Sequence, residues 1–193
     1  MEDHLDRFVH SAGQMRLDIG KTRDELRIII QELQRSNGIP DSGIRITLTG
    51  GYSPDGYSLA RPNLIITQQP LQVTVKEDLP RSMRLITWPH QRQMADVKTI
   101  DYLMAIWLQP QIRDSGADDV LYYREGFISE CPRSNFFIVT PNDTIVTPYR
   151  HILKGITRLK VLEIAASRYP GRAAGPAYGR AKDREGGVYY EYD

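Results

Sequence analysis

Four short segments carry residue types that could act together in chemistry. The first surrounds Lys98, which lies between an expected strand and an apolar helix. An ammonium group is poorly placed there unless it is paired or deprotonated, and burial lowers the pKa of a lysine. A neutral lysine amine can bond to an aldehyde carbon, so the position suits that chemistry. By itself the segment is more typical of a surface lysine at the start of a helix.

The second segment is a polar turn between two hydrophobic runs, residues 128–137. Glu130, Arg133, Ser134 and Asn135 give this turn a carboxylate, a guanidinium, a hydroxyl and an amide. A carboxylate that leaves a strand at such a turn can face a cationic ring nitrogen, because nearby opposite charges stabilise each other. By itself the segment is more typical of a polar hairpin turn.

Two further segments could bind an anion. Gly155, Ile156 and Thr157 begin an expected helix, and the N–H groups and dipole of a helix start attract phosphate. Arg7 lies on an expected amphipathic helix and could add a guanidinium to the same phosphate. Each feature has a plainer alternative, because most such helix starts bind nothing and a lone arginine on such a helix is normally solvated.

Together the four segments meet the demands that pyridoxal phosphate makes on a protein. This cofactor needs a lysine amine, a charged partner for its pyridine nitrogen, and donors for its phosphate. In order and spacing the sequence resembles the fold-type IV pyridoxal-phosphate enzymes, which include branched-chain aminotransferases, D-amino-acid aminotransferases and aminodeoxychorismate lyases. The resemblance covers residues 4–169, and its most specific motifs are residues 130–136 and 153–158.

The resemblance implies roles for the matching residues around the cofactor ring. Lys98 would form the Schiff base and act as general base and general acid. Glu130 would pair with the pyridine nitrogen, and Tyr102 would lie beside the ring hydroxyl. Ser134 and Asn135 would shape the loop next to the cofactor.

The resemblance also implies a phosphate site and a substrate site. The phosphate-binding residues would be Arg7, Gly155, Ile156 and Thr157. Arg45, on an expected strand, and Arg133 are the candidates for the substrate carboxylate, because a bidentate guanidinium suits a carboxylate. Arg133 favours a D-amino-acid type of substrate or an atypical one, although a salt bridge at the surface explains it equally well.

Hydrophobic periodicity and turn residues predict the elements that must position these side chains. A capping box at Thr22 and Glu25 predicts the start of the second helix, and Pro110 is expected to kink or shorten the third. The strands after residue 120 are expected to form a meander of hairpins. Expected helices span 3–15, 21–36, 99–115 and 155–167; expected strands span 44–49, 64–67, 84–88, 120–124, 127–129, 135–139 and 144–146.

The expected fold class is α+β, in the two-domain form of the fold-type IV aminotransferases. A small α/β domain is expected over residues 1–76, a cofactor-binding pseudo-barrel domain over 77–170, and a disordered or irregular tail over 171–193. Family members carry further strands before the first helix and after the last one. Both domains are therefore expected to be incomplete, with the chain truncated at both ends.

Composition excludes several other classes of protein. The net charge is +1, which gives no bulk electrostatic reason to expect nucleic acid or an anionic membrane as a partner. One cysteine, Cys131, excludes an internal disulfide and suits a reducing cytosol, where we expect a buried structural thiol. The acidic start is unlike a secretory signal, and no apolar run is long enough to span a membrane. The four histidines are too scattered to predict a metal site.

The resemblance implies an enzyme that catalyses transamination between an amino acid and a 2-oxo acid, and the composition suits a cytoplasmic location. A branched-chain L-amino acid or a D-amino acid is the expected substrate, and a homodimer is the expected assembly, because both are usual in the family. Elimination of the aminodeoxychorismate-lyase type on the same scaffold is one alternative. A truncated remnant without catalytic activity is the other.

Overall fold

The computed structural model describes residues 1–71, 82–168, 179–184 and 187–192. The chain divides into two compact units, Met1–Leu79 and Pro80–Asp193. The division and the domain boundary expected after residue 76 both fall outside the described residues. Among the described residues, no helix is long and apolar enough to cross a membrane.

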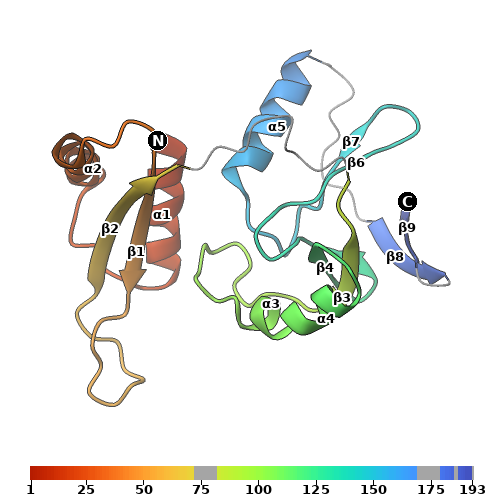
Figure 1. Cartoon of the computed structure of the whole chain (residues 1–193), viewed down its shortest axis with the longest axis horizontal. Helices are drawn as coiled ribbons and strands as arrows, with labels where there is room; N and C mark the ends of the chain where they lie inside the picture. The colour runs from red at the N-terminus through yellow and green to blue at the C-terminus, as the bar shows by residue number, and fades with distance from the viewer. Residues whose placement is uncertain (72–81, 169–178, 185–186, 193) are drawn as a thin grey trace. The chain divides into compact units, whose positions relative to one another are not determined.

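The described part of the first unit contains two helices and a hairpin, which can be followed in Figure 1. Thr22 accepts a hydrogen bond from the backbone of Glu25, whose carboxylate accepts one from the backbone of Thr22, as the sequence predicts. Leu5, Leu26 and Ile30 are buried and pack against the apolar side chains of the two strands. The elements are α1 (Glu2–Gln14), α2 (Arg23–Asn37), β1 (Ser42–Thr49) and β2 (Asn63–Pro70).

The second unit contains a five-stranded sheet in the order β3-β4-β5-β8-β9. Strands β3 and β4 are parallel and the other pairs are antiparallel. The strands of this sheet are β3 (Leu85–Pro89), β4 (Asp119–Arg124), β5 (Phe127–Ile128), β8 (Gly179–Arg184) and β9 (Gly187–Tyr192). The described residues of this unit also form a separate antiparallel pair and three helices: β6 (Ile138–Val139), β7 (Ile145–Val146), α3 (Leu103–Trp107), α4 (Gln109–Asp114) and α5 (Ile156–Arg168).

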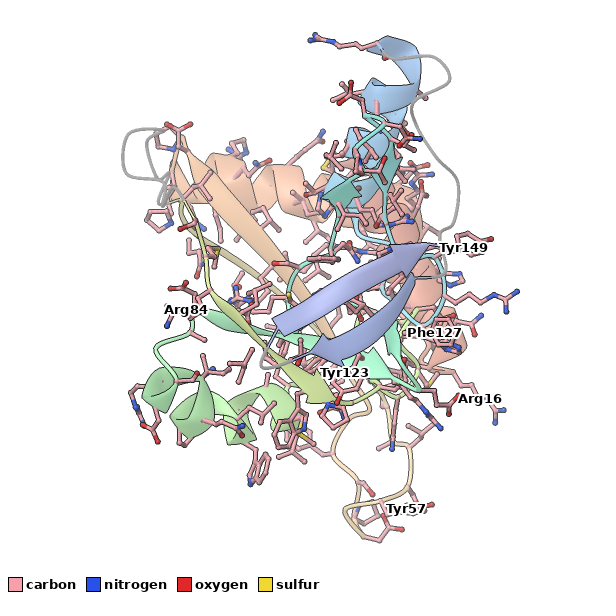
Figure 2. The ribbon with its side chains drawn as sticks, turned by 90° about the vertical axis from the view of Figure 1, so that its right-hand side faces the viewer. Arg16, Tyr57, Arg84, Tyr123, Phe127 and Tyr149 are labelled. Carbon is pink, nitrogen blue, oxygen red and sulfur yellow. The ribbon has the colours of Figure 1, made fainter. Side chains whose placement is uncertain are left out.

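Strand β4 contributes side chains to two hydrophobic clusters of the second unit, one on each of its faces. Val120 and Tyr122 pack with Leu108 and Ile112, while Leu121 packs on the other face with Ile128 and Cys131. Hydrogen bonds between Arg84 and Asp118 fix the start of β3 beside β4, and Tyr123 lies toward the opposite end of the pair (Figure 2).

The structure differs from the expected elements in three places. The helix expected from residue 99 begins only at Leu103, and it divides at Leu108 into two short helices, because Pro110 interrupts it as the sequence predicts. The strand expected over 135–139 is reduced to β6. The tail expected to be irregular contains β8 and β9, which pair as a hairpin. Val188 and the tyrosines near it favour a strand, although charges and glycines obscured that signal.

Candidate active site

Glu130 follows β5 and enters a tight turn. The backbone of Tyr122 donates to the Glu130 carbonyl at 3.0 Å, which continues the pairing of β4 beyond β5. The turn closes because Cys131 N donates to Ser134 O at 2.9 Å and because Glu130 pairs with Asn135. The backbone of Glu130 is therefore fixed by pairing with β4 and within the turn, and the residue is only 4% exposed.

Three donors surround the Glu130 carboxylate. Arg92 Nε donates to Oε1 at 2.9 Å, and Leu153 N donates to Oε2 at 2.9 Å. Asn135 Nδ2 lies 3.4 Å from Oε2. Burial raises the pKa of Glu130, and the Leu153 N–H, the Arg92 guanidinium and the charge of Lys98 each act to lower it.

Asn135 connects the Glu130 turn to the start of α5. Its Nδ2 donates to Leu153 O at 2.8 Å. Its Oδ1 lies so close to Gly155 that a Cβ added to the glycine would sit 2.2 Å away from it. Only glycine at position 155 leaves room for this amide. The carboxylate and the helix start are thus positioned by the same side chain.

The start of α5 has the arrangement expected of an anion site. The helix begins at Ile156, directly after Gly155, and Leu159 N donates to Gly155 O at 2.9 Å. N–H groups in the first turn of a helix have no acceptor within the helix and point outward. Thr157 is exposed in this turn, while Gly155 and Ile156 are partly buried.

Arg158 fixes the position of this helix start. Its Nε donates to Thr147 Oγ1 at 3.2 Å, and its Nη2 donates to Pro148 O at 3.0 Å. Thr147 is buried and in turn donates to Phe136 O at 2.8 Å. Burial lowers the pKa of Arg158. The arginine that ends the 153–158 motif therefore supports the helix start and links it to the segments that follow β7 and the Glu130 turn.

Lys98 lies in the loop between β3 and α3, in the expected place along the chain, but it is not buried as Schiff-base chemistry would favour. The side chain is exposed, whereas its neighbour Val97 is buried, so the apolar contact in this loop is made by the valine. Lys98 Nζ lies 3.3 Å from Tyr102 Oη and 5.9 Å from the centre of that ring. Lys98 and Tyr102 thus lie together in the structure with the lysine open to solvent, and the roles assigned to them stay predictions.

The other predicted residues lie at the edges of this arrangement or in the first unit. Arg133 and Ser134 are exposed in the turn after Glu130. Arg7 lies on α1, where burial lowers its pKa, and Arg45 is exposed on β1. The cofactor and substrate contacts assigned to these four residues stay predictions.

Two important contacts were not found from the sequence. Arg92 lies between β3 and Lys98 in a polar run with no motif of its own, and its partner Glu130 is 38 residues away. The Leu153 N–H belongs to the backbone, so no residue type could indicate it. A second arginine, Arg158, was recognised only as part of a motif and not as the anchor of α5.

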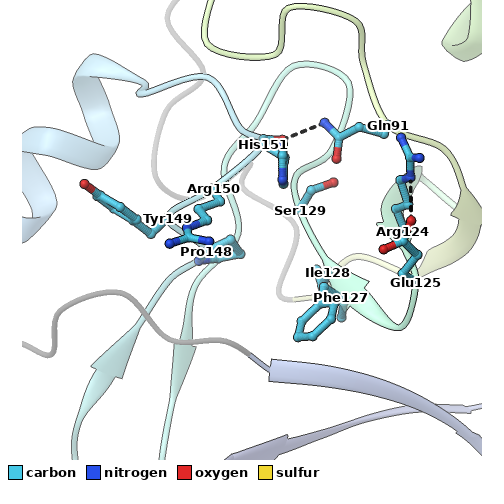
Figure 3. A pocket seen from close by; sticks show the side chains of 10 residues that line it. All are labelled: Gln91, Arg124, Glu125, Phe127, Ile128, Ser129, Pro148, Tyr149, Arg150 and His151. Carbon is cyan, nitrogen blue, oxygen red and sulfur yellow. Dashed lines mark hydrogen bonds and ion pairs between the residues drawn. The ribbon is translucent and has the colours of Figure 1, made fainter.

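The structure also contains a cavity of about 500 Å³ beside the β4–β5 hairpin (Figure 3). Gln91 Nε2 donates to His151 O at 2.9 Å across it, and Arg124 pairs with Glu125 at its rim. The residues that line it do not include Lys98 or Glu130, although Ser129 lies directly before Glu130 in the chain. The lining residues are Gln91, Arg124, Glu125, Phe127, Ile128, Ser129, Pro148, Tyr149, Arg150 and His151. In the described part of the chain, no three His, Cys, Asp or Glu side chains gather as a metal site would require.

Comparison with known proteins identifies the family to which this chain belongs. The sequence pattern of the family described as Amino-transferase class IV matches residues 1–172. The chain belongs to the class IV aminotransferases. Its membership confirms the resemblance inferred from the motifs around Glu130 and Gly155.

Two curated relatives illustrate the range of this family. A putative branched-chain-amino-acid aminotransferase of Methanocaldococcus jannaschii is 31% identical over 86% of this chain and 60% of its own length. A D-alanine aminotransferase of Bacillus licheniformis is 25% identical over 85% of this chain and 59% of its own. This class IV chain thus spans about 60% of the length of these relatives.

Solved structures show the same fold. A putative 4-amino-4-deoxychorismate lyase from Legionella pneumophila has a TM-score of 0.78 and 21% identity, covering 98% of this chain and 75% of its own. A hypothetical aminotransferase from Mycobacterium tuberculosis, in its PLP-bound form, has a TM-score of 0.72 and 22% identity, covering 93% of this chain and 66% of its own. The expected α+β fold of the fold-type IV aminotransferases is confirmed.

Proposed function

We propose that this chain carries the cofactor site of a pyridoxal-phosphate-dependent transaminase, which moves an amino group between an amino acid and a 2-oxo acid. The observation that carries the proposal is the placement of Glu130. Its buried carboxylate is bound by Leu153 N, two residues before Gly155, and the charge of Lys98 acts on it. A ligand with a cationic ring nitrogen and a phosphate fits these groups.

The residues around the ring then have distinct tasks. When bound, pyridoxal phosphate supplies an aldehyde for amines and a ring that accepts electrons from the α-carbon bond. Lys98 Nζ would act as the general base and general acid that moves the α-proton of the substrate, and Tyr102 Oη, 3.3 Å from Nζ, would orient the amine. Glu130 would hold the pyridine nitrogen, because a nearby carboxylate favours the protonated form of that nitrogen.

The phosphate and the substrate carboxylate need donors of their own. The N–H groups at the start of α5 would bind the phosphate, and Arg7 would add a guanidinium. Arg45 or Arg133 binds the substrate carboxylate through paired N–H groups. Ser134 and Asn135 shape the wall of the site. Asn135 also holds the Glu130 turn next to the start of α5 through its contacts with Leu153 and Gly155.

A branched-chain L-amino acid or a D-amino acid is the proposed substrate, and the names of the relatives support both. Half-reactions with L-leucine and D-alanine distinguish them, with release of the 2-oxo acid as the measurement. Aminodeoxychorismate serves as a third substrate, because elimination from it would assign the lyase reaction in place of transamination.

The first test is attachment of the cofactor to Lys98. Protein incubated with pyridoxal phosphate should absorb near the boundary of the visible and ultraviolet, and borohydride should fix the cofactor to Lys98 in peptide mapping. Lys98→Ala should abolish the labelling, whereas Lys21→Ala, at an exposed lysine of the first unit, should leave it intact. Chain that stays colourless and unlabelled would support the inactive remnant instead.

The proposal extends to assembly and location. We propose a homodimer in the cytosol, because members of the resembled group are usually dimers and Cys131 is a free, buried thiol. Light scattering at several protein concentrations measures the assembly, and a single mass equal to that of one chain would contradict a dimer.

A further inference from the structure

The hydrogen bonds of Glu130 indicate which of its oxygens faces a ligand. A carboxylate offers about four acceptor positions, two on each oxygen. Oε2 already accepts from Leu153 N and Asn135 Nδ2, whereas Oε1 accepts from Arg92 Nε. Among the described residues, the acceptor position left over is therefore on Oε1. A ring N–H that binds Glu130 has to share this atom with Arg92.

Arg92 is well placed to control that atom. Its side chain is 13% exposed and that of Glu130 is 5% exposed, so the pair is almost sealed from water. Arg92 Nη2 also donates to the carbonyl of Ala95, a buried residue in the loop that leads to Lys98. The planar guanidinium thus spans from the carboxylate to the backbone of the lysine loop, and its orientation is fixed at both ends.

We propose that Arg92 is a positioning residue of the cofactor site, which fixes Oε1 of Glu130 and keeps it charged so that it meets a protonated pyridine nitrogen. This role rests on the function proposed above. It is distinct from the roles of Lys98 and Glu130, because Arg92 acts on the cofactor through the carboxylate.

The charges around Glu130 show why an arginine is needed. Burial raises the pKa of Glu130, and the cations that act against this effect are Arg92 and Lys98. The adjacent Cys131 thiol, whose own pKa is raised to about 12, adds no charge at neutral pH. Lys98 has to be neutral when its amine bonds to an aldehyde. At that stage Arg92 is the cation that holds Glu130 ionised.

The first test uses the cofactor-free chain labelled with ¹³C at the glutamate carboxyls. Glu130→Gln identifies the Glu130 signal, and its titration midpoint is then measured in the wild type and in Arg92→Met. We expect Arg92→Met to raise the midpoint by about one pH unit or more, a tenfold change in proton affinity. Arg113→Met, at an exposed arginine of α4, is the matched control and should leave the midpoint unchanged. An unchanged midpoint in folded Arg92→Met overturns the proposal.

The second test measures binding of 4-deoxypyridoxine 5'-phosphate, which lacks the aldehyde and cannot bond to Lys98. Arg92→Met should weaken binding about tenfold at neutral pH. In the Glu130→Gln background the same change should have little further effect, because Arg92 acts through the carboxylate. Equal affinity of the wild type and Arg92→Met, or effects that simply add, would overturn the positioning role.

Arg92→Lys makes the test independent of whether Arg92→Met folds. Lysine keeps the charge but loses the planar fork, so the Glu130 midpoint should stay near the wild-type value while probe binding weakens. Wild-type affinity in Arg92→Lys would overturn the positioning role. If the wild type itself binds no probe, the proposed function fails, and the titration still decides whether Arg92 controls Glu130.

Discussion

At the scale of single residues, Glu130 and Cys131 are both buried, but the groups around them shift their pKa values in opposite directions. Both side chains are almost inaccessible, and burial raises the pKa of each. The carboxylate is surrounded by donors that partly offset this rise, whereas negative charges at Asp119 and Glu130 raise the pKa of the thiol further. Adjacent positions therefore hold one group suited to a charge and one suited to remain neutral.

The raised pKa of Glu130 predicts how stability depends on pH. The folded chain holds a proton on Glu130 at a higher pH than the unfolded chain does. The stability that this proton contributes is therefore fully present below the pKa of Glu130 in the unfolded chain, and it is lost as the pH rises through the pKa of Glu130 in the folded chain. We expect the unfolding free energy of wild type, minus that of Glu130→Gln, to fall as the pH rises from about 4.5 through the folded pKa. Urea unfolding of both proteins at a series of pH values measures this difference in unfolding free energy. A difference that rises with pH would contradict the prediction.

The Cys131 thiol is predicted to be unreactive in the folded chain. Its pKa is raised to about 12 and the residue is 7% exposed, so little thiolate exists near neutral pH and reagents cannot reach it. A chromogenic disulfide reagent should react at least about a hundredfold more slowly with folded chain than with chain in denaturant. Rapid labelling of folded protein would show that this part of the second unit opens readily.

At the scale of elements, the sequence predicts best where the signal is local. The capping box of α2 and the hairpins β4–β5 and β6–β7 depend on residues close in sequence, and all are present. Pro110 interrupts the expected helix, because proline has no backbone N–H to donate and its ring clashes with the preceding turn of a helix. The contacts of Arg92 and Leu153 with Glu130 were not predictable, because they require segments that only the tertiary fold brings together.

The cap of α2 gives a prediction for the first unit. Thr22→Ala removes the acceptor for Glu25 N and should lower the unfolding free energy by about 1 kcal/mol. Thr22→Ser keeps the hydroxyl and should retain most of the stability. Urea unfolding followed by helical circular dichroism measures both, and equal losses in the two variants would show that the hydroxyl is not the cause.

Gly155 gives a prediction for the start of α5. A methyl group at this position would overlap Asn135 Oδ1, so Gly155→Ala should displace the amide and weaken phosphate binding about tenfold or more. Affinity for pyridoxal phosphate compared with pyridoxal, which lacks the phosphate, measures the effect. The control is Gly13→Ala in α1, where an added Cβ meets nothing within 4 Å. A loss of affinity that is equal for both compounds would contradict an effect at the phosphate.

At the scale of the whole molecule, the fold class was predictable and the order of the strands was not. Alternation and turns indicated short strands, but the parallel pairing of β3 with β4 depends on the crossover that carries Lys98 and α4. The strands of the C-terminal segment were also missed, since glycines and charges masked their pattern. The assignment to a family came from the motifs and not from composition, which is ordinary.

The parallel pairing of β3 and β4 has a kinetic consequence. A hairpin such as β4–β5 closes early in folding, whereas a parallel pair must first close a long loop, which is slow. Arg92 and Lys98 both lie in that loop, so neither can reach Glu130 before β3 docks. We expect added pyridoxal phosphate to leave the early refolding phases unchanged in stopped-flow fluorescence and to slow only the final unfolding of the finished chain. The β4–β5 hairpin, which Glu130 follows, would form first, and the loop that carries Arg92 and Lys98 would dock last.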